Sequence, residues 1–477
     1  MRTASLFALL CLFARAFAAD ESPPIPQDPA ERANRQRETL AWTRSWLIDA
    51  YDKAGHKDPR WDKAARSALE MAVKNLAAQG DPPPQESDVC SAMKLAIDAG
   101  CTDPLIAYLH VRLTLKDDFP NQQELFRRNK EVILALQKSD YPASRRAIAL
   151  VNLGAVAEDI KELSATDRAD TAKALDAALA LMPSVVAEGN GRDAQERWCE
   201  IGCMAVRGYV VINGGDDEAA LQKVEAEFAK VSELKVTRSL VRCIHWVHKG
   251  WSDYNASRDD QASAQAAWSK CCDLLAQARQ PLAEAWDAQP GNEITATWML
   301  WIEYGIGRDH DEMEKWFERA MKSNSDNRRA CEVKLAWLDP RWQGTTEKIL
   351  EFGRKCRETK NWRAGITLLV GEAHLRQGKY LESQGQTLGA YLKQPQVWEE
   401  IRAVNDEYLS HFPHDHDART RYACLCSLAE QYAEAHRQFQ RLADRVIPQR
   451  DFDAAWIKKA KETAAEKVTA EESSLGS

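Results

Sequence analysis

The sequence is short of the patterns that usually reveal a function. It contains no Gly-x-Ser-x-Gly, His-Glu-x-x-His or phosphate-loop motif, which are common signatures of hydrolases, zinc peptidases and nucleotide-binding proteins. It has no Cys-x-x-Cys pair of the zinc or redox type. Alternating β-branched residues are nearly missing, and YVVI at 209–212 is the one strand-like piece. The net charge of −8 argues against nucleic acid as a main partner, because phosphate binding needs a basic face.

Long apolar runs are also missing, since no segment after the N-terminus approaches the roughly 18 residues of a membrane helix. We therefore expect no membrane span. The first residues, MRTASLFALLCLFARAFAAD, resemble an export signal, with Arg2, an apolar stretch from Ser5 to Ala14, and small residues at Ala16 and Ala18. This pattern predicts a bacterial protein in the periplasm or outside the cell. The alternative is a cytoplasmic chain with an apolar first helix.

Helical periodicity fills almost all of the chain after residue 31. Apolar residues recur at helical spacing in Leu40, Trp42, Trp46 and Leu47. Because proline is tolerated in the first turn of a helix, starts are expected at Asp58-Pro59, Asp103-Pro104 and Tyr141-Pro142.

Repetition is the most informative feature of the sequence. WDAQPGN, ending at Asn292, and MKSNSDN, ending at Asn327, lie 35 residues apart, with helices expected over 293–304 and 312–322. A helix-turn-helix with a period near 34 residues is typical of tetratricopeptide arrays. Such units bury their apolar faces only by stacking. We predict an all-α fold, an irregular tetratricopeptide-like α-solenoid of stacked helix hairpins.

Two later segments fit the same repeat. In residues 364–397, the small residues Gly371 and Ser383 are expected where the helices approach, with a turn at 378–380 and Pro395 closing the unit. Residues 416–449 repeat the pattern, with Ala423 and Ala435 at the small positions, and an additional helix is expected over 398–411.

The chain divides on these patterns into six regions. They are a signal peptide (1–18), a Pro-rich linker (19–35), an N-terminal helical region (36–190), a central Trp-rich helical repeat domain (191–360), C-terminal tetratricopeptide-like repeats (361–458) and a tail (459–477).

Part of the central region carries a family resemblance. The stretches HKGWSDYNASRDDQASAQAAW, PLAEAWDAQPGN, WFERAMKSNSDN and LDPRWQGTTEKILEFGRKC lie within residues 242–356. This segment resembles the bacterial family called domain of unknown function 4034. The resemblance covers about a quarter of the chain and implies a helical repeat without an established activity. The flanking units resemble tetratricopeptide repeats, whose usual role is to bind proteins or peptides in a concave groove.

Cysteines are numerous, with eleven besides Cys11, and an exported protein oxidises those pairs that its geometry allows. Cys90 and Cys101 flank a short expected helix and are our candidate disulfide. The other close pairs fall in helical patterns and are expected to pack as small hydrophobes: Cys199 with Cys203, Cys271 with Cys272, and Cys424 with Cys426.

The segment HFPHDHD at 411–417 is the strongest candidate for a metal site. His411, His414 and His416 stand beside two aspartates, a ligand set that suits zinc or nickel. The alternative is a turn between repeats, in which Pro413 ends one helix. We favour the turn and expect no metal or cofactor. His245 and His248 share one helix face, but a third ligand is not evident.

Tryptophan is abundant, with 16 copies, of which 11 lie from residue 198 to residue 362. Exported helical proteins rich in Trp include α/α-barrel glycan-processing enzymes, which need two carboxylates across a cleft. The repeat spacing favours an open solenoid, in which most Trp side chains pack between helices. We therefore expect a scaffold that binds a protein or peptide partner without catalysis. The alternatives are a helical-barrel glycan hydrolase or lyase and an architectural spacer.

The stretch LDPRWQGTTEKILEF at 338–352 looks like a functional motif but also suits a join between helices. Pro340 is expected to end one helix, Gly344 to supply a left-handed turn, and Thr345 to cap the next helix. Trp342 would then be an apolar plug between repeats. We predict this structural role rather than a ligand site.

Overall fold

The computed structural model describes residues 22–26, 28–77, 83–114, 119–189, 191–257, 260–307, 309–443, 445–449 and 451–475. The predicted signal peptide, residues 1–18, lies outside these ranges, so export stays a prediction. The described residues divide into two compact units.

The N-terminal unit consists of residues 28–306 together with Phe412–Asp415. Its helices are α2 (Pro29–Arg44), the π-helical turn η1 (Ser45–Asp49), α3 (Ala50–Ala54), α4 (Asp62–Leu76), α5 (Glu86–Asp98), α6 (Pro104–Leu113), α7 (Gln122–Gln137), α8 (Ala143–Glu158), α9 (Ala165–Ala180), α10 (Met182–Ala187), α11 (Arg192–Ile212), α12 (Asp217–Phe228), η3 (Ser232–Leu234), α13 (Lys235–Ser257), α14 (Gln261–Ala288) and α15 (Glu293–Ile306).

The C-terminal unit consists of Gly307–His411 and the residues from His416 onward, joined by residues 22–26 from the start of the chain. Its helices are α16 (His310–Ser323), α17 (Arg328–Trp337), α18 (Thr346–Glu358), η4 (Ile366–Leu368), α19 (Leu369–Ser383), α20 (Leu388–Leu392), α21 (Pro395–His411), α22 (His416–Leu428), α23 (Tyr432–Leu442) and α24 (Ala454–Leu475).

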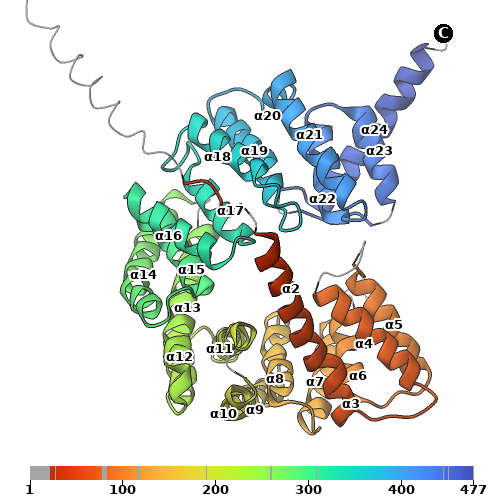
Figure 1. Ribbon diagram of the computed structural model, residues 1–477, viewed down its shortest axis with the longest axis vertical. Coiled ribbons are helices and arrows are strands. Elements are labelled where there is room, and N and C mark those ends of the chain that lie inside the picture. The colour runs from red at the N-terminus through yellow and green to blue at the C-terminus, as the bar shows by residue number, and fades with distance from the viewer. Residues whose placement is uncertain are drawn as a thin grey trace, which may run out of the picture. The chain divides into compact units, whose positions relative to one another are not determined.

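The predicted fold class is confirmed, because the described chain is all-α and helices that follow one another pack in pairs. In the N-terminal unit α4 packs on α5, α7 on α8 and α13 on α14 (Figure 1). In the C-terminal unit α18 packs on α19 and α22 on α23. No strand occurs in the described ranges, and the strand-like residues 209–212 form the last turn of α11. This is a solenoid-like arrangement of stacked helices.

Capping explains several of the helix starts. Asp28 accepts the N–H of Ala30 at 2.8 Å and so begins α2, seven residues before the expected end of the Pro-rich linker at residue 35. Asp103 accepts the N–H of Leu105 at 2.9 Å at the predicted start of α6. Both helices have proline in the first turn, as predicted for α6 but not for α2, whereas the helix expected at Asp58-Pro59 begins at Asp62.

The predicted helices at 293–304 and 312–322 are present as α15 and α16. The boundary between the two compact units falls at Gly307, between these helices. The predicted central region, 191–360, therefore contributes to both units.

The repeat predicted at 364–397 is corrected by the structure. Helix α19 continues through the expected turn at 378–380 and ends at Ser383, which is exposed. Gly378 instead allows close packing, because a Cβ there would lie 2.4 Å from a methyl carbon of Leu388 on α20. Gly371, expected at a close approach, faces open space at its Cβ position. Pro395 begins α21 rather than closing the repeat.

The later part of the repeat prediction agrees with the structure. The additional helix expected over 398–411 is α21, and residues 416–449 contain the helix pair α22 and α23. Ala423 on α22 and Ala435 on α23 are both buried, as the pattern of small residues predicts.

The motif at 338–352 is a join between α17 and α18. Thr345 accepts the N–H of Lys348 at 3.3 Å and caps α18, as predicted. Gly344 does not have a left-handed backbone; it is needed because a Cβ there would lie 1.9 Å from the carbonyl oxygen of Leu338. Trp342, predicted to be an apolar plug, is half-exposed. The buried tryptophan next to this segment is Trp337, at the end of α17.

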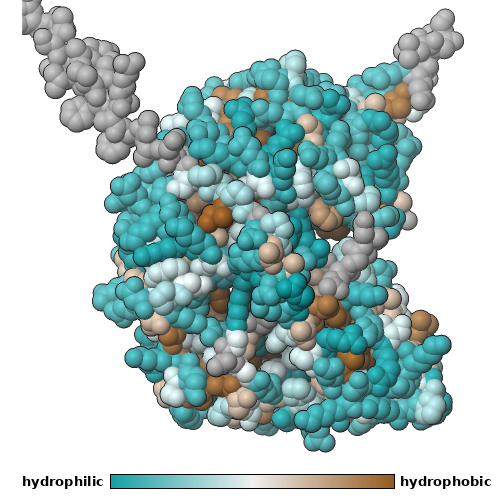
Figure 2. Space-filling model, in the orientation of Figure 1, coloured by the Kyte–Doolittle hydropathy of each residue, from teal (hydrophilic) through white to brown (hydrophobic). Residues whose placement is uncertain are grey.

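Polar side chains cover most of the visible surface (Figure 2). The large apolar side chains that are exposed among the described residues are scattered: Leu76, Leu95 and Ile447. A cavity is therefore a better candidate for a binding site than an exposed apolar patch.

Candidate functional site

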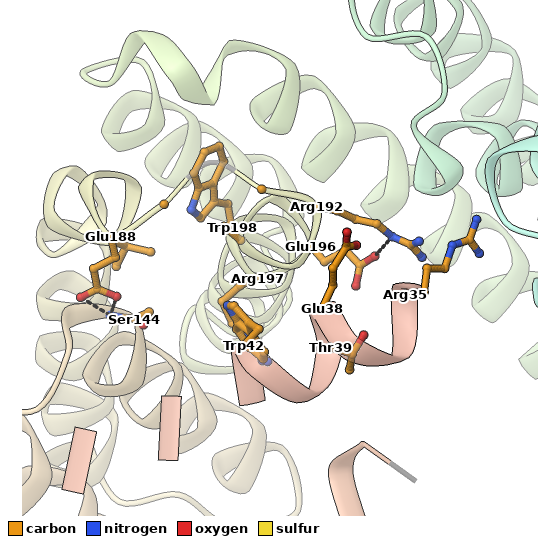
Figure 3. Close-up of a pocket in the computed structure, with 14 residues that line it drawn as sticks. Arg35, Glu38, Thr39, Trp42, Ser144, Glu188, Arg192, Glu196, Arg197 and Trp198 are labelled. Carbon is orange, nitrogen blue, oxygen red and sulfur yellow. Dashed lines mark hydrogen bonds and ion pairs between the residues drawn. The ribbon is translucent and has the colours of Figure 1, made fainter. Parts of the chain in front are cut away.

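A cavity of about 460 Å³ lies in the N-terminal unit, a size within the usual range of ligand pockets. Its walls come from α2, the N-terminal end of α8, the connection between α10 and α11, and the first turns of α11 (Figure 3). We call this cavity the α2–α11 pocket.

Helix α2 supplies one wall through a single face. Arg35, Glu38, Thr39 and Trp42 line the pocket, and their spacing of three and four residues places them on one side of the helix. Arg35 is paired with Glu31 one turn earlier at 2.7 Å. This face is mixed, with charges, a hydroxyl and one large aromatic ring, so it offers both polar and apolar contacts.

A π-helical turn follows α2 directly and positions a second tryptophan beside the pocket. Residues 45–49 form this turn, and π turns inside helices occur often at functional sites. Trp46 in the turn is buried, stacks on Trp42 at a centroid distance of 4.9 Å, and donates its indole N–H to the Ser144 hydroxyl at 3.1 Å. The stacking contact with the buried Trp46 ring thus fixes the Trp42 side chain.

Two guanidinium groups contact the Trp46 ring. Arg197 of α11 lies 4.4 Å from the ring centroid and 5.3 Å from that of Trp42. Arg145 of α8 lies 3.5 Å from the Trp46 ring. Desolvated cation–π contacts of this kind are worth about 2 kcal/mol. They fix the rings and leave the Arg197 guanidinium on the pocket wall, where it also pairs with Glu200.

Arg145 is the most unusual charge in this region. It is 3% exposed, and its Nε and Nη2 atoms have no hydrogen-bond partner among the described residues. Burial, aided by the nearby Arg197 charge, lowers the pKa of Arg145 to about 10. The Trp46 ring compensates for part of this desolvation. Among the described residues, no carboxylate lies at hydrogen-bond distance from Arg145, so its positive charge behind the pocket is not neutralised.

The acidic side chains of the pocket have defined structural partners. Glu188, from the connection after α10, accepts the backbone N–H groups of Ala143 and Ser144, the latter at 3.2 Å (Figure 3). It therefore caps α8, which starts after Pro142 without a side-chain cap of its own. A negative charge at that helix end is stabilised by the helix dipole.

Arg192, in the first turn of α11, bridges two carboxylates. It lies 3.1 Å from Glu196 and 2.5 Å from Glu293 of α15. Burial raises the pKa of Glu293, and the Arg192 guanidinium opposes this rise. The pair thereby fixes the start of α11, where Glu196 faces the pocket (Figure 3).

Tryptophan and arginine are the residues that dominate binding energy at protein interfaces, together with tyrosine. Here Trp42 supplies apolar contact area beside the buried Trp198, while Arg35, Arg192 and Arg197 supply donors in a fixed geometry. The arrangement can hold an anchoring side chain of a partner, with acceptors on that partner facing the guanidinium groups.

The predicted metal ligands do not form a cluster in the structure. His411 and His414 are exposed and His416 is buried, and His411 packs against Trp362 at a centroid distance of 5.4 Å. A group of three or more His, Cys, Asp or Glu side chains suited to a metal does not occur in the described part of the chain. The segment connects α21 to α22, as the turn alternative expects.

The predicted disulfide between Cys90 and Cys101 is not formed, and both are free thiols. Cys90 lies near the start of α5 with its sulfur 3.7 Å from the Thr114 hydroxyl, whereas Cys101 follows the other end of the helix. The helical part from Cys90 to Asp98 alone rises about 12 Å, about twice the roughly 6 Å between bridged Cα atoms. The helix between the two cysteines therefore prevents their pairing.

The other residues singled out in the sequence, a histidine and several tryptophans, have structural partners within the fold. His245 lies 2.8 Å from Asp217 of α12. Several of the central tryptophans pack with tyrosines in one aromatic cluster at neighbouring ends of α13, α14 and α15, consisting of Trp251, Tyr254, Trp268, Trp301 and Tyr304. The rings contact one another at 4.9–6.3 Å, which agrees with packing between helices.

The α2–α11 pocket was not predicted from the sequence. The apolar pattern of this segment includes Trp42 but does not show that Trp42 lines a cavity. The mixed face of Arg35, Glu38, Thr39 and Trp42 is the signal that could have indicated it.

Comparison with known proteins gives no assignment, because no family model and no curated protein sequence matches the chain. In the described ranges, no helix combines the length and the apolar character that crossing a membrane requires.

Proposed function

We propose that the protein is an exported helical-repeat scaffold that binds a protein or peptide partner through the α2–α11 pocket and does not catalyse a reaction. The periplasm or the outside of the cell is its proposed location, on the basis of the N-terminal leader pattern. The repeat-type sequence pattern and the stacked helices support a binding role.

The observation that carries the proposal is the packing of Trp42 and Arg197, which line the pocket, against the buried Trp46 beside it. The Trp46 ring contacts Trp42, Arg145 and Arg197, so Trp42 and Arg197 line the pocket in a preorganised geometry. Preorganisation lowers the entropy lost on binding.

Site-specific photo-cross-linking tests the proposal. A benzophenone amino acid replaces Thr39 in the pocket in one chain and the exposed Leu95 on α5 in a control chain. Both are expressed in the source cells, and cross-linked proteins are identified by mass spectrometry. We expect a defined partner from position 39 that is missing from position 95.

The affinity of the identified partner is then measured with the purified proteins. Truncating a central aromatic anchor costs about 2 kcal/mol or more, so Trp42→Ala should weaken binding roughly 30-fold. Leu95→Ala should leave it unchanged. Equal cross-linking at both positions, together with turnover of envelope glycans by the pure protein, would refute the proposal in favour of a glycan-processing enzyme.

A further inference from the structure

Residues 22–26, Ser-Pro-Pro-Ile-Pro, lie against α16 and α17 of the C-terminal unit, although they come from the start of the chain (Figure 1). We call this segment the strap. Ser22 makes all three of its polar contacts there. Its N–H donates to Glu314 at 2.8 Å, its carbonyl accepts from Lys334 at 2.9 Å, and its hydroxyl donates to Glu318 at 3.2 Å.

The groups that hold the strap form a built site. Lys334 is fully buried, Glu314 is 8% exposed, and the two are joined by a 2.7 Å ion pair. The Lys334 ammonium also lies 4.4 Å from the Phe317 ring and 5.0 Å from the Phe352 ring. The main-chain N–H and carbonyl of one residue thus bind a buried anion and a buried cation, which contact main-chain groups rather than a particular side chain.

The proline content suits this mode of binding. Proline fixes its own φ and confines the preceding residue to extended conformations, so Ser22, Pro23 and Ile25 are all restricted before docking. An extended proline-rich segment therefore loses little conformational entropy when it binds. Pro24 is buried in the site, whereas Pro26 is exposed, so the contact is selective along the segment.

We propose that the strap site on α16 and α17 is a recognition site for extended proline-containing peptide segments, and that residues 22–26 occupy it as an internal competitor. A partner segment with the same chemistry has a free N–H and carbonyl on one residue, followed by prolines. This inference does not depend on the α2–α11 pocket, which lies in the other unit.

The strap competes because it is covalently attached. A tethered segment meets its site at an effective concentration set by the tether, so a free peptide of equal intrinsic affinity binds more weakly until the strap is released. Release needs only the loss of a few contacts by five residues. The site would then be open to a partner in trans.

The test measures binding of a fluorescent peptide with the sequence of residues 20–28, DESPPIPQD, to the full chain by fluorescence anisotropy. Pro24→Asp places a carboxylate at a buried position of the strap and should displace the strap. Pro26→Asp changes an exposed position and is the matched control. We expect the Pro24→Asp chain to bind the peptide at least about tenfold more tightly than the unmodified and Pro26→Asp chains.

Two further measurements show that the peptide occupies the strap site. A peptide with alanine in place of each proline should bind the Pro24→Asp chain about tenfold more weakly, because it loses preorganisation and the buried ring. Adding Glu318→Ala, a partly exposed site that contacts the Ser22 hydroxyl, should weaken the original peptide about 2- to 10-fold.

Three results would overturn the proposal. A folded Pro24→Asp chain that does not bind the peptide would show that the site accepts only the attached strap. Equal binding by the three chains would place the peptide elsewhere. Unfolding of the C-terminal unit in the Pro24→Asp chain, seen as loss of its protected amides in hydrogen exchange, would make the strap a permanent part of the fold.

Discussion

Two glycines in one helix pair of the C-terminal unit should differ in how their replacement by alanine changes stability. Gly353 on α18 and Gly371 on α19 are both buried and both within helices. A Cβ on Gly353 would lie 2.8 Å from the Cβ of Ala373 and 3.1 Å from the Cα of Val370, while a Cβ on Gly371 would meet nothing within 4 Å. Only Gly353 is therefore required for the close approach of α18 to α19.

The magnitudes follow from two terms. Replacing a helical glycine with alanine gains about 1 kcal/mol of helix propensity at either position. At Gly353 overpacking adds a cost of about 1–3 kcal/mol, because backbone atoms of α19 must move. Gly371→Ala should thus raise the free energy of unfolding by up to about 1 kcal/mol. Gly353→Ala should leave it unchanged or lower it by up to about 2 kcal/mol.

Urea denaturation followed by circular dichroism gives the overall effect, and hydrogen exchange of the α18 and α19 amides reports on the C-terminal unit alone. Because the propensity gain is common to both variants, their difference isolates the packing term. A Gly353→Ala chain that is as stable as Gly371→Ala would refute the close packing of these helices.

Substitutions at three other positions test features of the fold. Asp103→Ala should lower the free energy of unfolding, measured by denaturation, by at least about 3 kcal/mol, because this fully buried carboxylate caps α6 and accepts a hydrogen bond from the Tyr141 hydroxyl at 2.9 Å. Asp103→Asn should lower it less. Equal effects of the two substitutions would contradict a role for the charge. Thr345→Ala should cost about 1 kcal/mol through loss of the α18 cap, while Thr345→Ser should be nearly neutral. Burial lowers the pKa of His374 below its ordinary 6.5 even though Glu400 lies 2.9 Å away, so the unfolded chain binds the proton more readily and stability should fall as the pH drops below about 6.5. A His374→Gln chain should show a flatter pH profile of unfolding between pH 7 and 5, and an unchanged profile would contradict this assignment.

Local signals in the sequence predicted the helices well. The starts of α6 and α18 follow from Asp103 and Thr345, whose side chains bond the first free N–H groups of the helix in any context. The predicted helices of the 293–322 hairpin agree with α15 and α16 for the same reason, because apolar period and turn residues are local properties.

Features that depend on tertiary packing were not predictable in this way. Gly344 and Gly378 were assigned to turns, yet one accommodates the Leu338 carbonyl and the other accommodates Leu388 of α20. A glycine in a sequence does not distinguish a turn from a close approach. The free Cys90 and Cys101 have a related explanation, because their distance is set by the rigid helix between them.

The α2–α11 pocket depends on contacts over still longer range. Arg145 and Arg197 reach the Trp46 ring from residues about 100 and 150 positions later in the sequence. Thr43 is the one buried residue of α2, so periodicity says little about which groups approach this helix. The mixed face of α2 could indicate a pocket, but the arginines that complete it are identified only in the folded chain.

The position of the strap in the sequence also affects the order in which the two units can fold during synthesis. Ser22 leaves the ribosome long before Glu314 and Lys334, which lie 292 and 312 residues later. All helices of the N-terminal unit, α2 to α15, are synthesised in that interval. The C-terminal unit therefore gains its first segment by a long-range closure after the N-terminal unit has been synthesised. Until then the Ser-Pro-Pro-Ile-Pro segment of the nascent chain can bind another molecule, because its own site has not yet been synthesised.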